Sequence, residues 1–330
     1  MTPVNPTMHH LGKHLHFTSD SAGNAMQHES LTLSLAHFVE IGGSSTPTAN
    51  GLHISVIHSF CESMRATIES RPDQPIIVCP EHHGVRTVSN ACQLCGAFLI
   101  LCEGATLDRV LSAFKHALQG FLPPRRTAIV DCWAALHRAR TLGWLGNADD
   151  EHEPALDVEM ACHYALACNG GVHVLVPGKL LLFPSPGQLP ADQAWVDVSE
   201  PGRPTARRFS AAFLAALLAD LGVSAAACLG RTCGSDAAAW RAGGLDVHDL
   251  ALDARRPALL GAMDRLLAVS RAAPGATALF PGRGCDADPA GEALPECAGT
   301  LAAAWLMTDF GFCSGAAAAW INMLCPGLLA

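Results

Sequence analysis

The chain has 330 residues, 50% of which are hydrophobic, and its formal net charge is -9 at pH 7. This length predicts about two domains of ordinary size, and the hydrophobic content is sufficient for packed cores. The 21 basic residues are not gathered into runs, which argues against nucleic acid or an anionic membrane as the main partner. No apolar run reaches the ~18 residues of a membrane span, and the N-terminus lacks the apolar core of a secretory signal. We therefore expect a soluble, cytoplasmic protein.

The elements of the first half are predicted from hydrophobic periodicity and turn residues. Residues 1–30 are polar and predict a disordered or extended tail. The pattern then predicts a strand over 30–35, a helix over 51–70, a buried strand over 75–79, a helix over 89–102 and a further helix that Thr106 caps. A helix over 127–142 lies between two polar or proline-rich segments, and it is typical of a linker between two halves.

The second half alternates strands and helices. The pattern predicts two strands within 172–183 around a turn at Pro177-Gly178, a helix over 209–221, strands over 225–229 and 247–252, a helix over 257–270, a strand over 276–280, and helices over 299–308 and 315–324. Such alternation predicts an α/β fold in which helices cover a mostly parallel sheet. Each half contains a strand, a loop and a helix in succession.

The 14 cysteines lie in apolar segments, which favours buried free thiols over the disulfide scaffold of a short secreted chain. Cys92 and Cys95 have the spacing of zinc ligands, but a second Cys/His pair at a suitable distance is missing from the sequence. The histidines near the N-terminus are expected to belong to a solvated tail. We therefore expect no metal and no other cofactor.

Short motifs along the chain give a family resemblance. They are, in chain order, Arg86-Thr87, Asn90-Ala91, Gly96-Ala97, His163-Tyr164, Asn169-Gly170, Pro177-Gly178-Lys179, His248-Asp249-Leu250, Gly299-Thr300-Leu301 and Pro326-Gly327. Over residues 31–327 the chain resembles the mitotic-exit dual-specificity phosphatases of the cell-division-cycle-fourteen family. The resemblance implies two tandem dual-specificity-phosphatase-like domains, each with a central, mostly parallel sheet flanked by helices, joined by a helical linker.

The implied domain boundaries place a tail at 1–30, an N-terminal noncatalytic domain at 31–125, a helical linker at 126–170 and a C-terminal phosphatase domain at 171–330. Active members of the family hold a thiolate nucleophile at the end of a strand and an arginine that binds phosphate where the next helix begins. Matched to the strand and helix of the C-terminal domain, the nucleophile falls near Phe280-Pro281 and the arginine near Glu296-Cys297.

The loop between these positions lacks the expected chemistry. Cys285 would require arginine at position 291, which is Gly291, and Cys297 would require it at position 303, which is Ala303. Pro281 also lacks the N–H that a phosphate cradle uses. The degenerate loop comprises Phe280, Pro281, Gly282, Arg283, Gly284, Cys285, Glu296 and Cys297. We therefore predict that the protein is not an enzyme and has no catalytic residue.

Two further sites follow from the resemblance. Asp253 lies near the place of the family's general acid, one position early, and marks a vestigial general-acid region. In the noncatalytic domain, Cys79, Arg86 and Thr87 follow a predicted strand and precede a helix, which indicates a weak anion site at a helix N-terminus. The spacing from Cys79 to Arg86 is too long for the phosphatase signature, and Glu81 would oppose a phosphate.

The hypothesis is a pseudophosphatase that serves as a structural or protein-interaction scaffold. Two alternatives stay open: residual dual-specificity phosphatase activity on phosphoserine/threonine-proline or phosphotyrosine proteins, and phosphopeptide binding without turnover. The expected partners are other proteins, with no nucleic acid and no membrane. The family resemblance implies a cytoskeletal setting, such as a microtubule-associated assembly at a cilium, basal body or centrosome.

Overall fold

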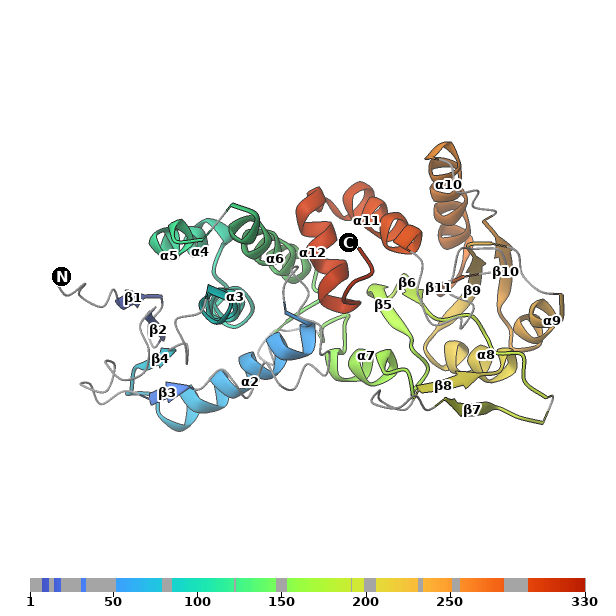
Figure 1. Ribbon diagram of the computed structural model, residues 1–330, viewed down its shortest axis with the longest axis horizontal. Coiled ribbons are helices and arrows are strands. Elements are labelled where there is room, and N and C mark those ends of the chain that lie inside the picture. Colours follow the sequence, from blue (N-terminus) through green and yellow to red (C-terminus); the bar gives the residue numbers. More distant parts are fainter. Residues whose placement is uncertain are drawn as a thin grey trace. The chain divides into compact units, whose positions relative to one another are not determined.

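A computed structural model describes residues 8–11, 15–18, 31–33, 52–78, 85–121, 123–146, 153–190, 192–198, 206–230, 234–250, 256–281 and 296–329. The chain divides into two compact units. The first unit is Met1–Pro154 with Phe312–Met323, and the second unit is Ala155–Gly311 with Leu324–Ala330. Both units combine helices with a sheet (Figure 1), so the predicted α/β class is confirmed.

The sheet of the first unit has four strands in the order β1-β2-β4-β3. They are β1 (Met8–His10), β2 (Leu15–Thr18), β3 (Leu31–Leu33) and β4 (Ile76–Val78). β4 pairs in parallel with both β2 and β3, and β1 is antiparallel to β2. β1 and β2 lie within residues 1–30, for which the sequence predicted a disordered or extended tail. Leu15 and Phe17 are nonetheless completely buried, because β2 adds to the edge of the apolar strand β4.

The described helices of the first unit include one, α3 (Val85–Leu101), that is buried along most of its length. The others are α2 (Ile54–Ser70), α4 (Leu107–Ala113), α5 (Lys115–Gln119), α6 (Pro123–Thr141) and α12 (Ser314–Leu324). Every residue of α3 from Ala91 to Leu101 is buried, and a helix that is apolar on all sides must lie in a core. α2 and α6 pack against α3. The predicted Thr106 cap is confirmed, since its hydroxyl accepts from the Arg109 N–H at 3.4 Å.

Gly96 lets α6 approach α3 closely. The indole of Trp133, on α6, lies against the backbone of Gly96, and a Cβ atom at position 96 would overlap it. The Trp133 Nε1 donates to the Gln93 carbonyl at 3.1 Å, and the ring packs on Phe114 with centroids 5.0 Å apart. Because the indole is held on several sides, it has little freedom to move away.

The segment Phe312–Met323 belongs to the first unit, although the sequence placed it in the C-terminal domain 171–330. The physical reason is aromatic packing. Trp144 lies 5.7 Å from Phe312 and 5.6 Å from Trp320, measured between ring centroids, and all of these side chains are buried. Aromatic pairs at such distances add to the free energy of burial, so they hold α12 to the end of α6.

The second unit contains a five-stranded sheet in the order β10-β9-β11-β6-β5. Its strands are β5 (His173–Val176), β6 (Leu180–Leu182), β9 (Val223–Cys228), β10 (Asp246–Asp249) and β11 (Ala276–Phe280). All pairings are parallel except that of β5 with β6, a hairpin. Gly178 adopts a φ of 66° at the predicted Pro-Gly turn. The predicted parallel sheet is therefore confirmed for this unit.

The second unit contains five described helices. They are α7 (Val158–Ala165), α8 (Ala211–Asp220), α9 (Gly234–Ala242), α10 (Arg256–Ala272) and α11 (Glu296–Phe310). Of these, α8, α9 and α10 lie in the connections between its parallel strands. α8 packs with α9, and α10 packs with α11. In Figure 1 the labels of α10 and α11 lie above those of the strands, and α8 and α9 lie below them. In the described part of the chain, no helix is both long enough and apolar enough to span a bilayer.

A second, separate hairpin was not predicted. It consists of β7 (Trp195–Val198) and β8 (Ala206–Phe209), which are antiparallel. Asp197 and Arg207 face each other across the hairpin, and the Arg207 Nε donates to the Asp197 carboxylate at 2.9 Å. The Arg207 guanidinium also lies 5.5 Å from the centre of the Trp195 ring. Cross-strand contacts of this kind are not visible in the local hydrophobic pattern, which explains why the hairpin was missed.

We expect Gly96→Ala to destabilise the first unit by about 1–3 kcal/mol, because the added methyl group overpacks a core contact with Trp133. Gly261→Ala is the matched control. Gly261 lies within α10, and a methyl group added there would meet the flexible end of Arg265 at 3.6 Å, an ordinary van der Waals contact. The control should therefore be neutral or stabilising by about 0.5–1 kcal/mol. Urea unfolding of both variants measures the difference, and equal stabilities would contradict the tight contact.

Candidate functional site

β11 ends on the side of the sheet formed by the carboxyl ends of the parallel strands, which is where parallel α/β folds bind their ligands. All five residues of β11 are buried, and the strand lies between β9 and β6. The Phe183 N–H donates to the Leu279 carbonyl at 3.0 Å, and the Leu229 N–H donates to the Phe280 carbonyl at 2.9 Å. Open parallel sheets bind ligands beyond the carboxyl ends of their strands. The connection from β11 to α11 is therefore a candidate ligand site.

Aromatic side chains occupy the position predicted for the nucleophile. Phe280 is buried, and its ring lies 5.2 Å from Phe183 and 5.6 Å from Trp240 between centroids. Pro281, the next residue, is also buried, and its carbonyl accepts a hydrogen bond from the Ser185 hydroxyl. Neither side chain has a nucleophilic atom. This end of β11 is consequently a packed apolar cluster.

One polar atom in this cluster is unsatisfied. Trp240 is completely buried, and its Nε1 has no hydrogen-bond partner among the described residues. A buried donor left unpaired costs about 1–3 kcal/mol. The Trp240 N–H can therefore donate to an acceptor at the carboxyl ends of the strands. The side chains of this cluster include no base and no nucleophile.

The helix that follows β11 begins with an acidic residue. Glu296 is the first residue of α11 and is exposed, and Cys297 follows it and is half-buried. The structure therefore places a carboxylate on the helix terminus where the resemblance requires an arginine. A carboxylate is stabilised by the positive end of the helix dipole, but it repels a phosphate dianion. Gly282, Arg283, Gly284, Cys285 and Asp253, which the resemblance suggested as a vestigial general-acid region, lie outside the described residues.

The predicted anion site of the first unit gains a residue that the sequence did not indicate. Arg86 and Thr87 lie in the first turn of α3, and Arg86 is exposed, whereas Cys79 lies outside the described residues. The Ser89 hydroxyl donates to the Arg86 carbonyl at 2.7 Å, and the Arg125 Nη1 donates to the Ser89 hydroxyl at 3.1 Å. A second guanidinium, from α6, therefore lies at the N-terminal turn of α3.

A pocket of about 190 Å³ opens at the opposite edge of the second sheet. Its lining residues are Ala155, Leu156, Asp157, Met160, Ala161, Tyr164, Val172, Val174, Gly178, Leu181, Leu221 and Ala276. Ala276 is the first residue of β11, Gly178 precedes β6 and Leu221 precedes β9. The pocket therefore lies at the amino ends of the parallel strands, away from the β11–α11 connection.

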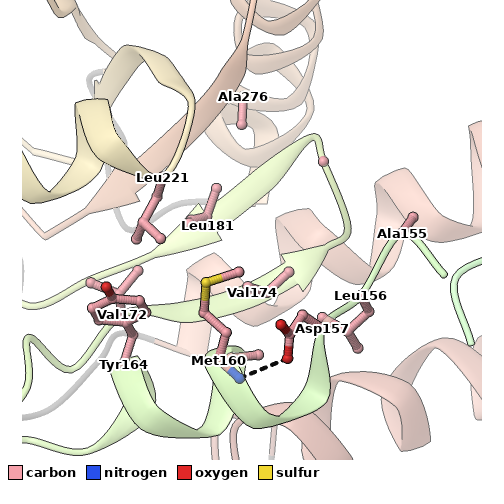
Figure 2. Close-up of a pocket in the computed structure, with 12 residues that line it drawn as sticks. Ala155, Leu156, Asp157, Met160, Tyr164, Val172, Val174, Leu181, Leu221 and Ala276 are labelled. Carbon is pink, nitrogen blue, oxygen red and sulfur yellow. Dashed lines mark hydrogen bonds between the residues drawn. The ribbon is translucent and has the colours of Figure 1, made fainter. Parts of the chain in front are cut away.

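The pocket is built by α7 over the β5–β6 hairpin. Figure 2 shows Met160 extending from α7 toward the strands that carry Val174 and Leu181. The Asp157 carboxylate is occupied as the cap of α7, accepting from the Met160 N–H at 2.9 Å. The lining is otherwise mostly aliphatic, so the pocket suits an apolar group. The sequence indicated only a family motif, His163-Tyr164, in the region of α7 and did not predict the pocket. The reason is that the wall of the pocket combines strands and helices that are distant in sequence.

In comparisons with known proteins, no protein-family model matches the chain, and no curated protein matches it significantly. Among the residues that the structure describes, three or more His, Cys, Asp or Glu side chains do not gather as a metal site would need. The functional proposal therefore depends on the chemistry of the β11–α11 connection, the turn of α3 and the apolar pocket.

Proposed function

We propose that the protein is a pseudophosphatase of two tandem dual-specificity-phosphatase-like domains with a helical linker, and that it acts as a protein-interaction scaffold. The observation that carries the proposal is the first residue of α11. A phosphatase of the resembling family needs arginine where the helix after the central strand begins, and this chain has Glu296 there. Replacing a cation by an anion reverses the sign of the interaction with phosphate, and solvent screening reduces it without changing that sign.

The residues at the end of β11 support the same proposal. A thiolate must extend from the strand end toward the substrate, but Phe280 turns its ring into the cluster with Phe183 and Trp240. Pro281 has no N–H to donate to a phosphate oxygen. Without a nucleophile there is no covalent phosphoenzyme, and without the arginine there is little to stabilise the transferring group.

The scaffold part of the proposal is supported by exposed apolar side chains near the pocket. Met160, at the pocket, is 48% exposed, and Leu166, just after α7, is 55% exposed. Trp195 is 45% exposed and stacks on Arg207, whose N–H donates to the Ala167 carbonyl at 3.1 Å. Arg207 thus joins the end of α7 to the β7–β8 hairpin. Apolar anchors beside a pocket are typical of protein-binding surfaces. The partner class is another protein, and the family resemblance favours a microtubule-associated or ciliary assembly.

Turnover is the direct test of the pseudophosphatase proposal. We expect the purified full chain to release no more phosphate from a phosphoserine-proline peptide, or from a phosphotyrosine peptide, than buffer alone. The physical reason is the absence of a paired thiolate and arginine in the sequence at the β11–α11 connection. Hydrolysis by the wild-type chain that Cys285→Ser or Cys79→Ser abolishes would contradict the proposal and favour the residual-phosphatase alternative.

The scaffold proposal predicts that partner binding depends on Met160. Met160→Asp places a charge at the mouth of an apolar pocket, so specific partners recovered by affinity purification from cell extract should fall at least about tenfold, as for loss of an interface anchor. Met307→Asp is the matched control, because Met307 is similarly exposed, at 44%, but belongs to α11 and does not line the pocket. Quantitative mass spectrometry compares the variants. Equal recovery with both would show that this surface does not hold the partner.

Phosphopeptide binding without turnover is a second candidate function, and Arg125 is the observation that favours it. The Arg125 guanidinium donates to the Ser89 hydroxyl in the N-terminal turn of α3, and Arg86 belongs to the same turn, where its backbone carbonyl accepts from Ser89. Free N–H groups and the helix dipole at such a turn attract anions, and arginine forms strong hydrogen bonds with phosphate.

Removing Arg125 tests this second candidate. Because exposed ion pairs contribute about 0.2–1 kcal/mol, Arg125→Ala should weaken phosphopeptide binding by up to about fivefold. Arg126→Ala is the control, since Arg126 is also exposed and follows directly in α6. Calorimetry with phosphorylated and unphosphorylated versions of one peptide gives the affinities. Binding that ignores the phosphate, or equal losses in both variants, would rule out this site.

A further inference from the structure

Two cysteines from different helices meet in the first unit. Cys61 lies on α2 and is 5% exposed, and Cys102 directly follows α3 and is half-buried. α2 packs against α3, which brings the two thiols into hydrogen-bonding contact. In the sequence they are far apart, and no spacing motif connects them. This contact distinguishes them from a lone thiol, because each sulfur has a second sulfur as its neighbour.

Charged side chains surround the pair. The Arg140 Nη1, from α6, donates to the Ile100 carbonyl at 2.8 Å, which fixes the guanidinium at the end of α3. Arg65, one turn after Cys61 on α2, is paired with Glu62. Both arginines act on the Cys102 sulfur through their charge, and Glu62 opposes them. The surroundings of Cys102 are thus partly open and contain two cations.

The hydrogen bond separates the roles of the two sulfurs. The bond from Cys61 lowers the pKa of Cys102, Arg65 and Arg140 lower it further, and burial and Glu62 act against them. The bond to Cys102, together with burial, raises the pKa of Cys61 well above its usual range. Cys102, which is half-buried and lies near two cations, is therefore the sulfur more open to an oxidant, and the buried Cys61 is its partner.

We propose that Cys61 and Cys102 form a peroxide-reactive dithiol that closes reversibly to a disulfide. The combination of two sulfurs in contact, one of them accessible and flanked by cations, is typical of redox-reactive cysteines. The disulfide would join α2 to the end of α3 and close a loop that contains β4. Such a crosslink restricts the unfolded chain and the movement of α2 against α3.

The reaction uses hydrogen peroxide as the oxidant. The Cys102 thiolate attacks one peroxide oxygen, the O–O bond breaks, and the leaving hydroxide takes a proton to become water while Cys102 becomes a sulfenic acid. The Cys61 sulfur then attacks the Cys102 sulfur. The S–O bond breaks, the S–S bond forms, and the departing hydroxide leaves as water with the Cys61 proton. In total, two thiols and one peroxide give one disulfide and two waters, and a dithiol reductant reverses the step.

Two other described thiols of the first unit, Cys92 and Cys132, are in different surroundings. Burial raises the pKa of the Cys132 thiol to about 12, with the Asp131 charge adding to the effect, and burial also raises the pKa of Cys92. Both side chains are completely buried, so peroxide does not reach them easily. Cys313 is exposed and provides a control for general thiol oxidation.

Peptide mapping of the full chain tests the proposal. The wild type is treated with hydrogen peroxide, free thiols are blocked with N-ethylmaleimide, and the protein is digested with trypsin and chymotrypsin. Cleavage after Arg65, Arg86 and Phe98 separates Cys61 and Cys102 from Cys92 and Cys95. We expect a crosslinked Cys61–Cys102 peptide as the main oxidised product, and we expect dithiothreitol to remove it. Cys313→Ser should form the same crosslink in the same yield.

A second measurement addresses the role of Cys61 in activating Cys102. In Cys61→Ala the crosslink is lost, and the rate at which iodoacetamide modifies Cys102 near pH 7 should fall severalfold, with its pH profile moved to higher pH. Wild-type protein in which Cys102 remains a free thiol, or oxidises without crosslinking to Cys61, would overturn the proposal. So would an unchanged pH profile for Cys102 in the variant. Peptide mapping of the wild type tests the proposal even if the variant does not fold.

Discussion

The architecture of the second unit depends on the burial of β11 in the middle of a parallel sheet. Each residue of this strand is buried, so its backbone hydrogen bonds must be made to β9 and β6. Because neighbouring strands are parallel to β11, the chain must cross back from the carboxyl end of one strand to the amino end of the next. This constraint brings the carboxyl ends of the strands together and places α11 directly after them. At the amino ends, α7 lies over the sheet and forms the apolar pocket. The two ends of the parallel strands therefore differ chemically. Aromatic rings fill the space at the carboxyl ends, whereas the apolar pocket opens at the amino ends.

The first unit depends on a different feature, the buried helix α3. Its apolar surface is covered by α2 and α6, and Gly96 permits the close approach of Trp133. The first turn of α3 and Cys102, just beyond its last residue, are less buried than the helix between them, and both places carry polar side chains. Arg125 donates to Ser89 at its start, and Cys102 contacts Cys61 just beyond its end. The same helix thus carries the proposed anion site at its start and the proposed redox-reactive pair just beyond its end.

Hydrophobic periodicity was sufficient to predict many of the regular elements, though not β1, β2 or the β7–β8 hairpin. The apolar strand at Ala276–Phe280, the Pro177-Gly178 turn and the capped helix after Thr106 all match the structure, because each depends on residues close in sequence. The candidate site was predictable only in part. α11 begins at Glu296, but the aromatic packing of Phe280 involves Phe183, just after β6, and Trp240, on α9, which no motif connects. Its intervening loop lies outside the described residues.

The sequence by itself determined the α/β class, many of the helices and strands, and the acidic identity of residue 296, since these depend on local patterning and on side-chain identity. Tertiary structure alone decided which distant residues meet. Packing of Trp144 on Trp320 joins α12 to the first unit, Arg125 reaches the turn of α3, and Cys61 contacts Cys102 across two helices. The same applies to the pocket beneath α7. The physical reason is that these contacts result from burying apolar surface between whole elements, and the energy of that packing has no signature in a short stretch of sequence.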